Sequence, residues 1–193
     1  DQGRSEAVVE LLVESADQTN DEEVAMRWLL AAADIAETRL DRTADAVAIY
    51  ERLLDMSPND VTAYEALDRL YRANGAWDDL ALVLERRRGA QLTAGSERDA
   101  VDTLYTLGQL ARNRLGDEER AVAAWAECVA LEPTFSSAID ALQAASARDE
   151  FGAAAREALC DAYRVTSQWE ALRDVLQQRV DARDAAHEGA DIN

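Results

Sequence analysis

Two stretches of this chain, residues 65–90 and 157–182, align with each other without a gap, and eleven of the 26 positions are identical. The identical pairs are Glu65/Glu157, Ala66/Ala158, Leu67/Leu159, Tyr71/Tyr163, Arg72/Arg164, Trp77/Trp169, Leu80/Leu172, Val83/Val175, Leu84/Leu176, Arg87/Arg179 and Ala90/Ala182. A helix–turn–helix unit that recurs along a chain is typical of a solenoid, in which each repeat buries its apolar face against its neighbours. Such a chain more often offers a binding surface than a catalytic centre.

The composition indicates an all-α fold. The 193 residues include only two prolines and eight glycines, and they are rich in Ala, Leu, Arg and Glu, which favour helix. Apolar residues recur at spacings of three and four along nearly the whole chain. We predict about ten helices, at residues 4–18, 21–40, 43–56, 60–73, 76–92, 96–115, 118–131, 135–147, 151–166 and 168–186.

The formal net charge of −19 and the isoelectric point of about 4.3 exclude several kinds of partner. Nucleic acid and anionic membrane surfaces would be repelled, and no run approaches the ~20 apolar residues of a membrane span. A basic protein partner fits the charge, although solubility alone also accounts for it. Every basic residue is Arg rather than Lys, which indicates the coding bias of a GC-rich, bacterial genome.

Residues that could carry chemistry are sparse. The single histidine, His187, lies in a polar tail, which leaves no Ser–His–Asp or Cys–His arrangement. Cys128 and Cys160 have neither metal-binding nor redox spacing, and two cysteines do not make a disulfide framework. We therefore expect no catalytic site, no metal and no cofactor, and the chain is not predicted to be an enzyme. The cysteine usage leans towards a reducing compartment such as the cytoplasm.

The spacing of large, small and turn-forming residues defines a repeat of 34 positions, since Leu80 follows Ala46 and Leu84 follows Tyr50 by 34 residues each. Further matches in this register are Pro58, Tyr64, Leu67, Tyr71, Gly75, Trp77, Gly116, Ala121, Trp125, Cys128, Pro133, Leu159, Cys160, Tyr163, Trp169, Leu172 and Leu176. The pattern resembles the tetratricopeptide repeat, a pair of antiparallel helices. The resemblance implies an α-solenoid with a right-handed superhelical twist and a protein-binding role.

The chain departs from this register in two places. The helices at 21–40 and 96–115 are one residue too long, since Gly108 and Gly116 are eight positions apart rather than seven. Residues 44–60 align with 119–135 at an offset of 75, whereas the opening pair has an offset of 92; the difference of 17 residues predicts an inserted helix at 135–147. We expect a single repeat domain over residues 1–193. Its units are a partial one at 1–18, then 21–58, 60–92, 96–133, the inserted helix and 151–186.

The two ends of the chain give opposite expectations. Helix 4–18 aligns with the second helix of a repeat whose first helix is missing, so we expect a fragment of a longer array that can self-associate through Val8, Leu11 and Leu12. The last helix should have a polar outer face, formed by Arg173, Asp174, Gln177, Gln178, Asp181 and Asp184. Trp77 and Trp169 should be equivalent, each wedged within its own helix pair near the turn.

The resemblance implies that the concave face, lined by the first helix of each repeat, binds the partner. Carried over to this chain, the lining is Arg27, Asp34, Glu37, Glu65, Arg69, Arg72, Asp102, Tyr105, Gln109, Arg112, Glu157, Asp161 and Arg164. Nothing here matches the Lys/Asn carboxylate clamp of chaperone-tail receptors. Two hypotheses remain: a scaffold that holds a protein or peptide in this groove, or a structural, self-assembling segment of a long repeat protein with no peptide groove.

Overall fold

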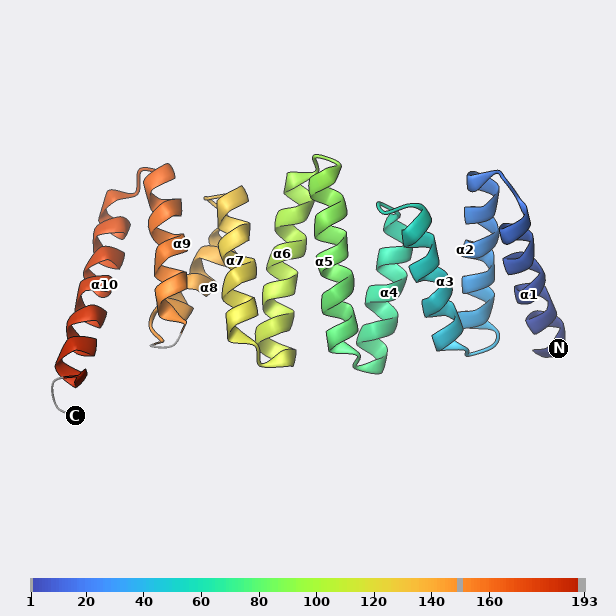
Figure 1. Cartoon of the computed structure of the whole chain (residues 1–193), viewed down its shortest axis with the longest axis horizontal. Coiled ribbons are helices and arrows are strands. Elements are labelled where there is room, and N and C mark those ends of the chain that lie inside the picture. The colour runs from blue at the N-terminus through green and yellow to red at the C-terminus, as the bar shows by residue number, and fades with distance from the viewer. Residues whose placement is uncertain (1, 149–150, 191–193) are drawn as a thin grey trace. The chain divides into compact units, whose positions relative to one another are not determined.

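The structure is a computed structural model that describes the backbone of residues 2–148 and 151–190, and the side chains of residues 2–148 and 151–181. The described residues form helices and short turns and contain no strand, so the fold is all-α (Figure 1). The helices are α1 (Gln2–Gln18), α2 (Glu22–Thr38), α3 (Thr43–Met56), α4 (Val61–Asn74), α5 (Trp77–Thr93), α6 (Glu97–Leu110), η1 (Ala111–Leu115), α7 (Glu118–Leu131), α8 (Ser136–Ser146), α9 (Gly152–Val165) and α10 (Trp169–Ala190).

Local signals place the helix ends close to where the sequence predicts them. Asp21, Asp60 and Asp117 each accept a hydrogen bond from the backbone N–H three residues on, at 3.1, 2.8 and 2.9 Å. Such N-caps satisfy donors that a helix start leaves without a partner. Gly75 and Gly116 end helices in the left-handed region, with φ of 67° and 68°. Gly3, which the alignment of helix 4–18 with the second helix of a repeat would place in the preceding turn, instead lies inside α1.

The chain divides into two compact units, Asp1–Ala90 and Gln91–Asn193, each a stack of antiparallel helices. In the first unit α2 packs on α1 and α3, and α3 packs on α4. Its core contains fully buried leucines from successive helices, among them Leu29, Leu53 and Leu67. In the second unit α7 packs on α6, α8 and α9, and Trp125 of α7 is among its most deeply buried side chains. The single domain over 1–193 and the right-handed twist stay predictions.

The turns of the two aligned stretches have the same hydrogen bonds. After α4 the N–H of Ala76 donates to the carbonyl of Tyr71 at 3.0 Å, and after α9 the N–H of Gln168 donates to that of Tyr163 at 2.9 Å. The left-handed residue of the turn after α4 is Gly75. The equivalent residue after α9 is Ser167, which has the same left-handed conformation with φ of 57°. A serine rarely takes this conformation, so the surrounding repeat imposes it.

The helices predicted at 21–40 and 96–115 each have one extra residue, and this residue lies in a wider turn at the end of the helix. At the turns after α4 and α9 the closing hydrogen bond spans five residues, but after α2 the N–H of Arg42 reaches the carbonyl of Ala36, six residues back. After η1 the N–H of Asp117 likewise reaches the carbonyl of Ala111, at 3.0 Å. In the second case the wider turn extends into a turn of π-helix over Ala111–Leu115.

The predicted inserted helix is present as α8 and is seen foreshortened between α7 and α9 (Figure 1). Its small residues Ala138 and Ala145 are buried, whereas Ala144 is exposed. Because α9 packs on both α7 and α8, the three helices form a cluster instead of a simple row. Irregular stacking of the repeats at this point stays a prediction. Residues 149–150, between α8 and α9, lie outside the described residues.

One prediction about the last helix pair is wrong and another is incomplete. Trp77 is half-buried, but Trp169 is 63% exposed and is not wedged within its helix pair. The last helix exposes the predicted polar residues Arg173, Asp174, Gln177, Gln178 and Asp181, but it also exposes Leu176 and Val180; Asp184 lies outside the described side chains. The equivalent of Leu176 is Leu84 of α5, which is only 4% exposed. The repeat register thus fixes backbone geometry, while burial depends on whether another helix covers the position.

Of the described glycines in the second unit, Gly108 of α6 lies closest to a neighbouring side chain. A Cβ there would lie 2.2 Å from Nε1 and 2.6 Å from Cδ1 of the buried Trp125 indole. We expect Gly108→Ala to lower the free energy of unfolding by ~1–3 kcal/mol, because the indole or α6 must move. Urea unfolding measures this. Gly89 lies in α5 with nothing within 4 Å of an added Cβ, so Gly89→Ala should stabilise by ~0.5–1 kcal/mol. Equal destabilisation by both changes would contradict the packing argument.

Candidate functional site

In the first unit, ion pairs join each helix to the next helix but one along the chain. Arg69 of α4 pairs with Glu37 of α2, which joins the first helices of successive repeats. Arg52 of α3 pairs with Asp17 of α1, and Arg86 of α5 pairs with Asp55 of α3 at 2.7 Å, which joins the second helices. Each pair spans about one repeat in sequence. We call the surface formed by the candidate residues of α2 and α4 the first-helix face.

The Glu37–Arg69 pair is the centre of the first-helix face. Both terminal nitrogens of Arg69 donate to the Glu37 carboxylate, Nη2 to Oε2 at 3.0 Å. The Glu37 side chain is only 16% exposed, and its hydrogen bond raises the pKa of Arg69. Burial raises the pKa of nearby Tyr50, and the negative charge of Glu37 adds to that rise. The phenol of Tyr50 therefore stays protonated beside a salt bridge that is fixed by two hydrogen bonds.

The other candidate residues of the first unit surround this pair and reach into water. Arg27, Asp34 and Glu65 are exposed. Arg72 is held within its own helix by Asp68, with Nε–Oδ2 and Nη2–Oδ1 distances of 2.7 and 2.9 Å. Of the candidates in the first unit, Glu37 and Arg69 meet between α2 and α4. That the others share one binding surface with them stays a prediction.

The candidate residues of the second unit lie on helices that are not packed directly on each other. α6 packs on α7, whereas α9 packs on α7, α8 and α10. On α6, Asp102 and Gln109 are exposed, and Tyr105 packs edge-on against Phe135 with ring centroids 5.4 Å apart. The Arg112 guanidinium lies 5.2 Å from the centre of the Trp125 ring, within the range of a cation–π contact.

The remaining candidates of the second unit are on α9. Glu157, Asp161 and Arg164 are exposed, and Arg164 pairs with Asp161 of its own helix at 2.7 Å. They lie on a different helix from the α6 candidates, and both helices pack on α7.

The three candidate self-association residues differ in how far their side chains are exposed to solvent. Val8 and Leu11 of α1 are exposed, Leu11 by 62% of its surface, whereas Leu12 is half-buried. An exposed apolar group that the sequence reasoning missed lies at the other end of the chain, at Val165, Trp169, Leu176 and Val180. The last three recur at spacings of seven and four, so the stripe is visible in the sequence. The repeat register concealed it by assigning Trp169 and Leu176 to the core.

The two cysteine thiols are buried. Both cysteines lie in the core, as the repeat register predicts. Burial raises the pKa of the Cys128 thiol to about 12, helped by the charges of Glu132 and Asp102. Among the residues with described side chains, no three of His, Cys, Asp and Glu are placed to hold a metal ion. His187 lies outside those residues. Within the described ranges no helix is long and apolar enough to cross a membrane.

Comparison with solved structures finds distant similarity, of which the following is an example. The crystal structure of MamA matches 81% of this chain and 96% of its own, with 16% sequence identity and a TM-score of 0.27. A likeness this low supports no argument about fold or function. No protein-family model matches the chain, and no curated protein matches it. The all-α repeat therefore rests on the helices and turns described above.

The raised pKa of Cys128 predicts a loss of stability in alkali. In the unfolded chain the thiol ionises near pH 9, but in the folded chain only near pH 12. Its stabilising contribution is full below pH 9 and is lost as the pH rises towards 12, because the unfolded state releases its proton first. Urea midpoints of the wild type and Cys128→Ala should converge between about pH 8 and about pH 10.5. A constant difference between them would contradict this.

Proposed function

We propose that this chain is a scaffold, similar to the tetratricopeptide-repeat family, that binds a protein or peptide on its first-helix face and carries no catalytic activity. The observation that supports the proposal best is the Glu37–Arg69 pair, because it holds α2 and α4 together and leaves charged side chains around it in water. The described thiols are buried, which favours binding over covalent chemistry.

The chemistry of the face selects the kind of partner. Arg27 and Arg72 offer positive charge, while Asp34 and Glu65 offer negative charge, all on exposed side chains. A segment with both acidic and basic residues would find complementary partners on this face, and a segment of one sign would be repelled in part. Because these side chains are at a solvated surface, each contact would add little, and specificity would come from their arrangement.

A second candidate function is self-assembly, and a specific observation favours it. The two terminal helices both expose apolar residues: Val8 and Leu11 on α1, and Trp169 and Leu176 on α10. Exposed apolar stripes on a repeat protein are surfaces that a neighbouring repeat or another molecule covers. In this hypothesis the chain is a structural segment, and its ends rather than its first-helix face carry the function.

A peptide selection tests the first proposal. Peptides selected from a displayed random library against the wild type should bind about tenfold more weakly to Arg69→Glu with Arg72→Glu, because that variant reverses the charge of the face. Fluorescence anisotropy measures the affinities. The matched control is Arg42→Glu, just before α3, with Arg52→Glu within α3, which changes the net charge equally. An equal loss in both variants, or no loss in either, would exclude the first-helix face as the binding surface.

Sedimentation velocity over a range of concentrations tests self-assembly. The wild type should associate, and Val8→Glu with Leu11→Glu should reduce association by placing charge on the exposed stripe of α1. Gln2→Glu with Gln18→Glu adds the same charge to that helix outside the stripe and should leave association unchanged. The variant Val165→Glu with Trp169→Glu tests the opposite end. A wild type that stays monomeric at every concentration would rule out this candidate.

A further inference from the structure

Helices α3, α4 and α5 form a hollow that the repeat pattern does not predict. It has a volume of about 160 Å³, several times the ~30 Å³ that one water occupies. Its apolar part consists of Leu54 and Val83, which are buried, and Leu82, which is 60% exposed. Its polar part is formed by Glu51, Tyr71, Asp79 and Arg86. It is therefore a surface recess with an apolar side and a charged rim.

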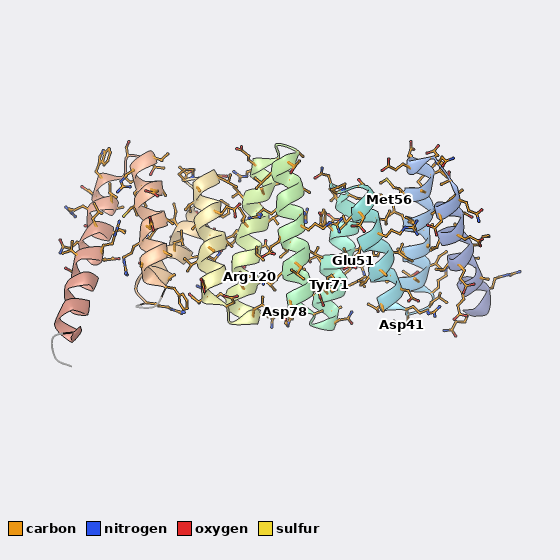
Figure 2. The ribbon with its side chains drawn as sticks, in the orientation of Figure 1. Asp41, Glu51, Met56, Tyr71, Asp78 and Arg120 are labelled. Atoms are coloured by element: carbon orange, nitrogen blue, oxygen red, sulfur yellow. The ribbon has the colours of Figure 1, made fainter. Side chains whose placement is uncertain are left out.

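Tyr71 holds one carboxylate of the rim in place. Its hydroxyl donates a hydrogen bond to Oε1 of Glu51 at 2.8 Å, and Figure 2 shows the two side chains next to each other. Burial raises the pKa of Tyr71, and the charges of Glu51 and Asp79 raise it further. The phenol therefore remains a donor throughout the neutral range. Glu51 is itself one of the residues that line the recess.

The charges of the rim do not balance. Arg86 is compensated, because its Nη2 lies 2.7 Å from Oδ1 of Asp55. Glu51 bonds only to a neutral phenol, and Asp79 makes no ion pair with any residue that the structure describes. The two carboxylates near the partly buried hydroxyl of Tyr71 thus have no cation of their own. The recess combines uncompensated negative charge with an exposed leucine.

We propose that this recess binds an arginine side chain of a partner protein. The guanidinium carries five donors in a planar fork, so it can bond to Glu51 and Asp79 together, while its methylene stem covers Leu82. A lysine offers a single point charge and satisfies one carboxylate at a time. The net charge of −19 steers such a cationic segment towards the chain. The recess takes Tyr71 from α4, but none of its lining residues belongs to the first-helix face, so the proposal does not depend on the function proposed there.

The test uses N-acetyl-arginine amide as the probe and the full chain labelled with ¹⁵N. Amide shifts of residues around the recess, in 51–55, 71 and 79–86, should change saturably with a Kd on the order of millimolar, as expected for a single side chain. N-acetyl-citrulline amide has nearly the same shape without the charge and should give no saturable change. N-acetyl-lysine amide should bind several-fold more weakly.

Two variants and a matched control locate the site. Asp79→Asn and Glu51→Gln should each weaken arginine amide by about two- to fivefold, the range of a partly exposed ion pair. Glutamine at position 51 still accepts the Tyr71 hydrogen bond, so the recess keeps its shape. Asp78→Asn changes the neighbouring acid in the same first turn of α5 and the same net charge (Figure 2), but Asp78 does not line the recess, so its affinity should equal that of the wild type.

Several outcomes would overturn the proposal. Shifts spread over the whole acidic surface, or an Asp78→Asn effect as large as that of Asp79→Asn, would show attraction by overall charge alone. Equal binding of citrulline amide would show an apolar contact only, and equal binding of lysine amide would remove the assignment to arginine. An absence of saturable shifts around the recess would exclude the site. None of these results would bear on the first-helix face, which is tested by its own variants.

Discussion

Each helix of this chain needs its neighbours to cover apolar surface that it cannot bury alone. Ala32, Ala33 and Ala36 of α2 have no exposed surface, because α2 packs on α1 on one side and on α3 on the other. Their small side chains allow the helices to approach closely. The same dependence explains the exposed residues of the first and last helices. Val8 and Leu11 of α1 are exposed, and so are Trp169 and Leu176 of α10. Stability in such a fold is shared between neighbours.

The helices and their ends could be predicted from the sequence because their signals are local. An aspartate before a helix and a glycine after it act within one turn, so Asp60 and Gly75 mark the limits of α4 without reference to the rest of the chain. The inserted helix α8 could be predicted too, since it changes the spacing between repeats. Seventeen residues is about the length of one helix with its turn.

What could not be predicted depends on contacts distant in sequence. The register assigned Trp169 to the core because Trp77 occupies the same position, but exposure is set by the presence of a covering helix. The first-helix face was predicted as a set of positions, whereas the pairing of Glu37 with Arg69, 32 residues apart, required the structure. The recess beside Tyr71 left no sequence signal, because its rim is assembled from three helices.

The wide turns after α2 and α6 have a consequence for how such a chain can evolve. In each, one additional residue is taken up by a hydrogen bond that spans six residues instead of five, from Arg42 to Ala36 and from Asp117 to Ala111. Single-residue insertions at these joints leave the spacing of the helices intact. A gene for this protein could therefore gain or lose codons at the joints without losing the fold, and the length of its repeats would drift while the architecture remained the same.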